Sequence, residues 1–166
     1  MIEILQYDAN DTSSPLVHPS DVISAKDLPS AQVYNAAELM KEAMLDQDEG
    51  LRALGLSAVQ INLPIRLIVV LYGSDYIWLV NPYIAKCSEQ TFDSREGCFS
   101  INTGHSQFWV ARYKRIKVKA FTPDGCPITL KLNSHQAAPF QHEIDHTNGI
   151  LICNKHKEQR DESKII

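Results

Sequence analysis

The sequence predicts an α+β protein, with antiparallel or mixed β-sheets packed around a C-terminal helix and a second helix near the N-terminus. Three observations support this class: helical spacing of apolar residues before residue 50, strand-like segments between residues 66 and 132, and a final segment with helix signals. The chain has 166 residues, of which 44% are hydrophobic. A chain of this size can bury a real core, so we expect a single domain over residues 1–166.

An irregular arm and then a helix are predicted at the N-terminus. Residues 8–30 are rich in Asp, Ser and Pro, so we expect residues 1–29 to run irregularly over the surface. In residues 30–46 apolar side chains recur at helical spacing, with Ser30 as the N-cap and Gly50 as the stop.

A hairpin is predicted next. Residues 66–72 and 76–80 are β-branched and aromatic, and they flank the turn signal Gly73-Ser74-Asp75. Asn81-Pro82 is expected to interrupt the second strand, which residues 83–86 then resume.

Two further strands and the last helix complete the fold. Residues 115–121 and 128–132 alternate between polar and apolar side chains, and Pro123-Asp124-Gly125 predicts the turn between them. Residues 134–147 are predicted to be helical, with Asn148-Gly149 as the stop. Residues 154–166 form a short polar tail.

Composition argues against several classes of protein. The net charge is −4 without a block of like charges, so we predict no direct nucleic-acid partner. Residues 1–11 lack the features of a secretory signal, and the longest apolar run, residues 67–72, is too short to span a bilayer. We therefore expect a soluble cytoplasmic protein without a membrane partner. Its four cysteines form no CxxC pair and are expected to be thiols or metal ligands.

The predicted last helix carries the motif His142-Glu143-Ile144-Asp145-His146. Residues four apart share one face of a helix, so both imidazoles can reach one metal ion. Glu143 stands beside the first ligand and could take a proton from water without binding the metal itself. Solvated side chains on an outer helix face would give the same pattern, but we favour the metal site.

A catalytic metal site needs about three protein ligands. In the familiar metalloprotease extension of this motif the third histidine would stand at Ile152, and the downstream chain is too short to bring back a glutamate. The best upstream candidate is Cys98, because the neighbouring Gly97 lets backbone approach a bound group closely. Taken alone, Cys98 would more often be an ordinary buried thiol.

Three ordered motifs resemble those of the peptide deformylase family. The segments at 53–60, 96–100 and 141–146 are similar to G-x-G-L-A-A-x-Q, E-G-C-L-S and Q-H-E-x-D-H. Between them, Asn81-Pro82-Tyr83-Ile84 resembles the family's N-P-x-I, and Val110-Ala111-Arg112 its V-P-R. The resemblance covers about residues 30–153.

The resemblance implies a metallohydrolase that removes the N-formyl group from the terminal formylmethionine of new polypeptides and releases formate. Cys98, His142 and His146 would hold one divalent metal ion, usually Fe(II) in the family, with Zn(II) or Ni(II) able to occupy the site. Water on this metal would attack the formyl carbon, with Glu143 as general base and then general acid. The Gln60 side chain and the Phe99 backbone N–H match the family's oxyanion donors.

The resemblance also implies a pocket for the methionine side chain and a brace for the cysteine loop. Pocket positions are Leu54, Gly55, Gly97, Phe99 and Ala138. Glu96 and Arg112 match an ion pair that supports the loop. Alternatively, the pocket residues could be ordinary core side chains, and Glu96 and Arg112 could form an ordinary surface ion pair.

The chain departs from the family pattern at several positions. Ala53 replaces a glycine, Ser57 an alanine and Phe99 a leucine. Residues 102–110 contain no Arg or Lys where the family commonly has an arginine that contacts the peptide, so peptide affinity is expected to be weaker. Pro139 is expected to start or bend the last helix.

The tail and two competing functions complete the expectations. Relatives often carry a longer C-terminal helix associated with ribosome docking. The segment at 155–164 is brief, so we expect at most a transient contact with the ribosome. A short tail would also fit a trimmed or phage-encoded member of the family that acts in a host cytoplasm.

A metallopeptidase would take a third His or Glu and would not need Cys98. A non-catalytic binding relative would have lost Glu143, Gln60 or a ligand, and all of these are present.

Overall fold

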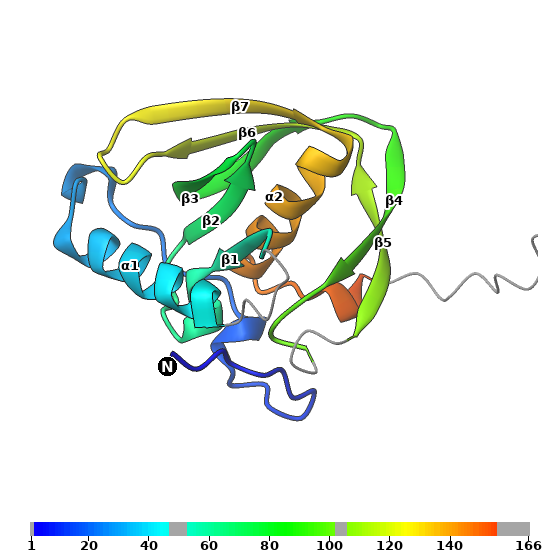
Figure 1. The fold of residues 1–166 in the computed structure, drawn as a ribbon, viewed down its shortest axis with the longest axis horizontal. Helices are drawn as coiled ribbons and strands as arrows, with labels where there is room; N and C mark the ends of the chain where they lie inside the picture. The colour runs from blue at the N-terminus through cyan, green and yellow to red at the C-terminus, as the bar shows by residue number, and fades with distance from the viewer. Residues whose placement is uncertain (1, 47–52, 102–105, 156–166) are drawn as a thin grey trace, which may run out of the picture.

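The computed structural model describes residues 2–46, 53–101 and 106–155. Its central element is the helix α2 (Ser134–Thr147), which lies between a five-stranded sheet and a two-stranded sheet (Figure 1). The α+β class with antiparallel sheets around the last helix is therefore confirmed.

The five-stranded sheet is antiparallel throughout, with the order β1-β2-β3-β6-β7. Its strands are β1 (Gly55–Ser57), β2 (Leu67–Tyr72), β3 (Asp75–Cys87), β6 (Arg115–Phe121) and β7 (Pro127–Asn133). One face packs on α2 through side chains such as Ile68, Leu79 and Val118. The opposite face of β2 and β3 packs on α1 (Ala31–Asp46), so β2 is buried on both sides.

The two-stranded sheet consists of β4 (Thr91–Gly97) and β5 (Gln107–Tyr113), which the sequence did not predict as strands. Glu96 and Ser94 lie opposite Phe108 and Val110. This ribbon forms the second wall around α2, on the side away from the large sheet (Figure 1).

Most predicted elements lie where the sequence placed them. Ser30 caps α1, because its hydroxyl accepts the Val33 N–H at 3.2 Å. Gly149 follows α2 with φ 72°, as expected of a C-terminal glycine. Gly50 lies outside the described residues.

Two expectations concern proline. Asn81-Pro82 does interrupt the pairing with β6 between Val80 and Tyr83, where Asn81 adopts φ 51°, but β3 continues through this irregularity as one strand. Pro139 does not start α2, which begins at Ser134 and continues through the proline, and the expected bend there stays a prediction.

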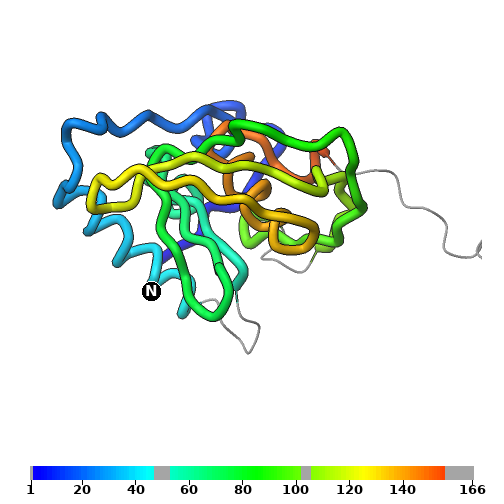
Figure 2. The backbone as a smooth tube through the Cα atoms, turned by 90° about the horizontal axis from the view of Figure 1, so that it is seen from above, coloured from blue at the N-terminus to red at the C-terminus, as the bar shows by residue number. Residues whose placement is uncertain are grey.

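The N-terminal arm is irregular apart from two short 3-10 turns, Pro15–Val17 and Ala25–Asp27. It runs past the end of α2, where the Ser20 N–H donates to the Thr147 carbonyl (Figure 2). A final 3-10 turn covers Ile152–Asn154, and the predicted tail beyond residue 155 lies outside the described residues. Within the described part of the chain, no helix has the length and apolar character needed to cross a membrane.

Candidate metal centre and active site

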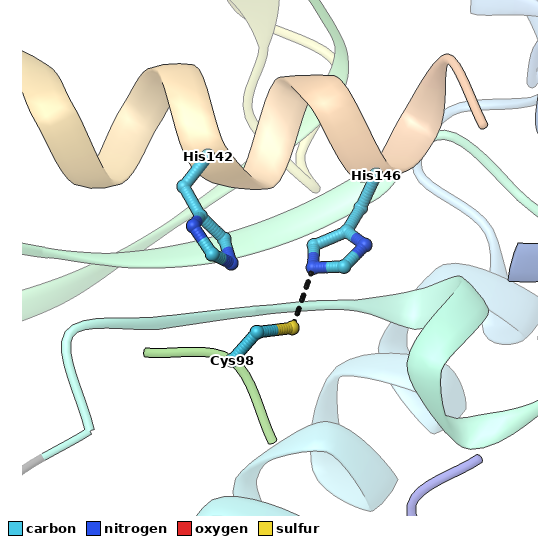
Figure 3. Close-up of side chains that lie close together, drawn as sticks. All are labelled: Cys98, His142 and His146. Carbon is cyan, nitrogen blue, oxygen red and sulfur yellow. Dashed lines mark hydrogen bonds between the residues drawn. The ribbon is translucent and has the colours of Figure 1, made fainter. Parts of the chain in front are cut away.

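Three potential metal ligands meet between α2 and the end of β4. His142 and His146 project from one face of α2 toward Cys98, which directly follows β4 (Figure 3). Their ligand atoms all lie within 4.8 Å of one another, and all three residues are buried. The Cys98 Sγ lies 3.3 Å from the His146 Nε2. The fold therefore brings together the three residues that the sequence nominated.

The orientation of His142 is fixed from behind by Glu96. Its Nδ1 lies 2.9 Å from a Glu96 carboxylate oxygen, which leaves the Nε2 free to face the cluster. Such a contact selects the tautomer that a metal-binding imidazole needs.

Arg112 holds this carboxylate in place. The guanidinium is 1% exposed and donates through Nε and Nη2 to both Glu96 oxygens, at 2.8 and 2.6 Å. Its remaining Nη1 donates to Asp145, which also accepts from Lys155 at 2.7 Å. The predicted Glu96–Arg112 pair is thus part of a buried network that connects β4, β5, α2 and the residue after the last turn. Burial opposes ionisation of Glu96, but hydrogen bonds from Arg112 and His142 lower its pKa to about 2.

Gln60 lies on the other side of the cysteine. It is 2% exposed, and its side-chain amide donates to the Ser100 hydroxyl at 3.1 Å and approaches the Cys98 Sγ at 3.7 Å. The amide oxygen accepts the Ser57 N–H at 2.9 Å, which fixes the rotamer. Gln60 therefore presents N–H groups, not an acceptor, toward the cluster.

The N-terminal arm also contacts the site, which the sequence gave no reason to expect. The Gln6 side chain donates to the Phe99 carbonyl at 2.8 Å, and the Tyr7 N–H donates to the Ser100 carbonyl at 2.8 Å. The Leu5 N–H donates to the Gln60 carbonyl. The bonds from the Leu5 and Tyr7 backbone have no residue-type signature, so no sequence pattern could have revealed them.

Glu143 is buried beside the cluster at 4% exposure, and one of its carboxylate oxygens has no hydrogen-bond partner among the described residues. Burial is the largest influence on this carboxyl and raises its pKa to about 7. A carboxyl with a pKa near neutrality can both accept and release a proton, which suits acid–base chemistry.

Gly55 makes room for this carboxylate. A Cβ at residue 55 would lie 2.7 Å from Glu143 Oε1 and 2.8 Å from its Cγ. Any side chain there would push Glu143 away, so glycine is required by close approach and not by φ. Ala53, which stands in place of the motif's first glycine, has no positive φ and is accommodated without strain.

A cavity of about 440 Å³ opens beside the cluster. All five predicted pocket residues line it, although Leu54 is 56% exposed and therefore stands at the rim. Arg95 and His135 line it as well, and the sequence offered no signal for either.

The electrostatics of the cluster suit a cation. Burial would raise the pKa of the Cys98 thiol, but the neighbouring His146 and His142 hold it well below its usual range. A thiolate and two imidazoles form a donor set that Fe(II) and Zn(II) both accept. The described residues that gather within reach as ligands are these three, so the third His or Glu expected of a metallopeptidase is absent from the cluster.

An α+β fold that buries a cysteine and a helix-borne histidine pair, with a glutamate beside them, defines a class of proteins built around one transition-metal site. Comparison with known proteins gives the particular family. The model of the polypeptide deformylase family matches residues 1–162. A peptide deformylase from Pelotomaculum thermopropionicum is 38% identical over 126 residues, 76% of this chain and 74% of that protein.

Comparison with solved structures gives the same family. The peptide deformylase of Thermotoga maritima superposes with a TM-score of 0.82 at 28% identity, covering 95% of this chain and 98% of the other. A Met-Ala-Ser-bound peptide deformylase from Acinetobacter baumannii gives 0.81 at 26% identity, covering 93% and 98%. The chain belongs to the polypeptide deformylase family.

Proposed function

We propose that this protein is a metal-dependent deformylase that hydrolyses the formamide bond of N-formylmethionyl peptides and releases formate. The observation that carries the proposal is the buried cluster of Cys98, His142 and His146 with Glu143 beside it, opening into a cavity. The family membership and the relative bound to Met-Ala-Ser support the same reaction.

Cys98, His142 and His146 would hold one divalent cation, and we favour Fe(II), with Zn(II) and Ni(II) as substitutes that the same ligands accept. When bound, the cation supplies Lewis-acid activation of water and of the formyl oxygen. Glu96 keeps the Nε2 of His142 directed at the cation, and Arg112 keeps Glu96 ionised for this task.

Glu143 would move the proton. Its buried carboxylate takes a proton from the attacking water and delivers it to the departing amine nitrogen of methionine. The bond between the formyl carbon and that nitrogen breaks, and formate and a free amino terminus result. Its pKa of about 7 allows both transfers near neutral pH.

The developing oxyanion would be met by donors already in place. The Gln60 amide is held by Ser57 and Ser100 close to the cysteine, and the Phe99 backbone N–H follows directly in the chain. Preorganised donors of this kind each contribute roughly 3 kcal/mol to the lowering of a barrier.

The methionine side chain would enter the apolar part of the cavity, between Gly55, Gly97 and Ala138, with Leu54 and Phe99 at its edge. Formylated peptides arise where translation begins with formylmethionine. We therefore place the enzyme in the cytoplasm of a bacterial or phage-infected cell, in transient contact with ribosomes.

Formate release from formyl-Met-Ala-Ser tests the proposal. Protein purified without oxygen and loaded with Fe(II) should release formate, and Glu143→Gln should lose about 10²–10⁴-fold in kcat while it keeps its metal. Acetyl-Met-Ala-Ser is the matched control substrate and should stay intact. Metal-loaded protein that releases no formate, or a Glu143→Gln variant with wild-type turnover, would refute the assignment.

A further inference from the structure

The face of the five-stranded sheet that turns away from α2 carries a concentration of positive charge. Lys86 of β3, Lys117 of β6 and Lys131 of β7 occupy directly opposite positions on three adjacent strands, and we call them the lysine row. Directly opposite residues project from the same face, and adjacent strands are about 4.8 Å apart. Ile116 and Val118 of β6 pack on the α2 side, so the lysine row projects from the other side.

The surroundings of the lysine row are also basic. Arg115 and Lys119 flank Lys117 on the same face of β6, because side chains alternate along a strand. Residues 83–87, β6 and β7 together contain five Lys or Arg and no Asp or Glu. None of the five forms an ion pair with another residue in the described ranges. This concentration stands out on a chain with a net charge of −4.

Fold stability does not account for the lysine row. Like charges directly opposite one another destabilise a sheet. Lysines do protect edge strands from pairing with other chains. That role could explain Lys131 on the edge strand β7, but Lys86 and Lys117 stand on interior strands. A surface that keeps an unfavourable charge arrangement indicates an anionic partner.

Tyr83 indicates which kind of anionic partner binds the basic face. It lies directly opposite Lys119, and therefore on the basic face, and it is 50% exposed. An exposed ring among cations is the combination on which single-stranded nucleic acids bind, with phosphates on the cations and a base stacked on the ring. An anionic membrane would be expected to meet more apolar side chains on this face.

We propose that this face binds single-stranded RNA, with phosphates along the lysine row and a base stacked on Tyr83. The sequence predicted no nucleic-acid partner because Lys86, Lys117 and Lys131 are separated by 31 and 14 residues along the chain. Only the pairing of the strands brings these three lysines together. The face lies across the sheet from α2, so bound RNA leaves the cavity open to peptide.

Fluorescence anisotropy with a labelled uridine oligonucleotide, titrated in increasing KCl, tests this assignment. The double variant Lys86→Gln/Lys131→Gln should bind about tenfold more weakly at low salt. Its slope of log affinity against log salt should fall by about 1.4, since each lost phosphate contact on a single strand removes about 0.7. The control Lys26→Gln/Lys41→Gln removes the same charge from exposed sites near α1 and should bind within about twofold of wild type.

Tyr83→Leu separates RNA from other polyanions. It should weaken RNA binding by about tenfold without changing the salt slope, and it should leave heparin binding unchanged. Circular dichroism and thermal melting confirm that each variant is folded. Equal losses in both double variants, full RNA affinity in Tyr83→Leu, or binding to phosphatidylserine vesicles but not to RNA would each overturn the proposal.

Discussion

The two sides of α2 are both buried, but they are buried in opposite ways. Toward the five-stranded sheet, Ala137, Phe140 and Ile144 join an apolar cluster with side chains of β2, β3, β6 and β7. Toward the β4–β5 ribbon, His142 and His146 meet Cys98 (Figure 3), and the buried Glu96–Arg112 pair lies behind them beside a smaller apolar cluster. One helix therefore separates a conventional core from a chemical site.

The two sides of α2 differ in the kind of interaction that stabilises them. Apolar contacts have no direction, so the sheet side depends on volume and area alone. On the ribbon side each charged group depends on a particular partner, as Glu96 and Asp145 depend on Arg112. Substitutions on the sheet side should therefore change stability, whereas those on the ribbon side should also change chemistry.

The largest expected effect is that of Arg112→Met. The substitution leaves the buried Glu96 carboxylate without its guanidinium partner and Asp145 with only Lys155, which should lower the free energy of unfolding by about 3–5 kcal/mol. Lys155→Met removes the half-exposed partner of the same Asp145 and should cost less than about 1 kcal/mol. Urea denaturation at pH 7 measures both, and similar values for the two variants would show that the network is not essential.

The same network predicts a pH dependence. The pKa of Glu96 in the folded protein, about 2, lies below its ordinary value of 4.5, so ionised Glu96 stabilises the fold above pH 4.5. That contribution is lost as the pH falls from 4.5 toward 2. The stability difference between wild type and Arg112→Met should shrink over this range, and a difference that stays constant in urea titrations would contradict the role of Glu96.

Gly55→Ala should have the next largest effect, and this effect should be on catalytic activity. The added methyl displaces Glu143, so kcat/KM for formyl-Met-Ala-Ser should fall about 10²-fold while the metal content stays unchanged. Gly73→Ala, at an open turn with φ 69°, should cost about 1 kcal/mol of stability and leave kcat/KM unchanged. Full activity in Gly55→Ala would show that Glu143 does not need its present position.

Ile144→Val should have the smallest effect. It removes one methylene from the apolar side of α2 and should lower the free energy of unfolding by about 1 kcal/mol. Because Ile144 faces the sheet, kcat/KM and metal content should remain at wild-type values. Thermal melting and formate release measure the two quantities, and a loss of activity without a loss of stability would break the division between the two sides.

This division also explains what the sequence could predict. The strands β6 and β7 face an apolar core on one side, so their patterns follow the expected alternation, whereas β2 is buried on both sides and reads as a continuous apolar run. In β4 the inward positions include the polar residues Ser94 and Glu96, which reverse the usual pattern. The ribbon was therefore missed as strands, although its functional residues were found through motifs.

The site could be predicted only as far as residue types reveal roles. His142, His146 and Cys98 carry chemistry in their side chains, and the fold gathers them as predicted. Gly55 was predicted to line a pocket, but its close approach to Glu143 depends on tertiary geometry. The arm bonds from Leu5 and Tyr7 depend on backbone N–H groups that every residue shares.

The most direct test of the central claim is the metal content of three proteins prepared side by side: wild type, Glu143→Gln and Cys98→Ser. If Cys98, His142 and His146 form the metal site and Glu143 only moves protons, wild type and Glu143→Gln should each hold about one ion per chain, and Cys98→Ser should hold far less. A Cys98→Ser protein that keeps its full metal content would contradict the account.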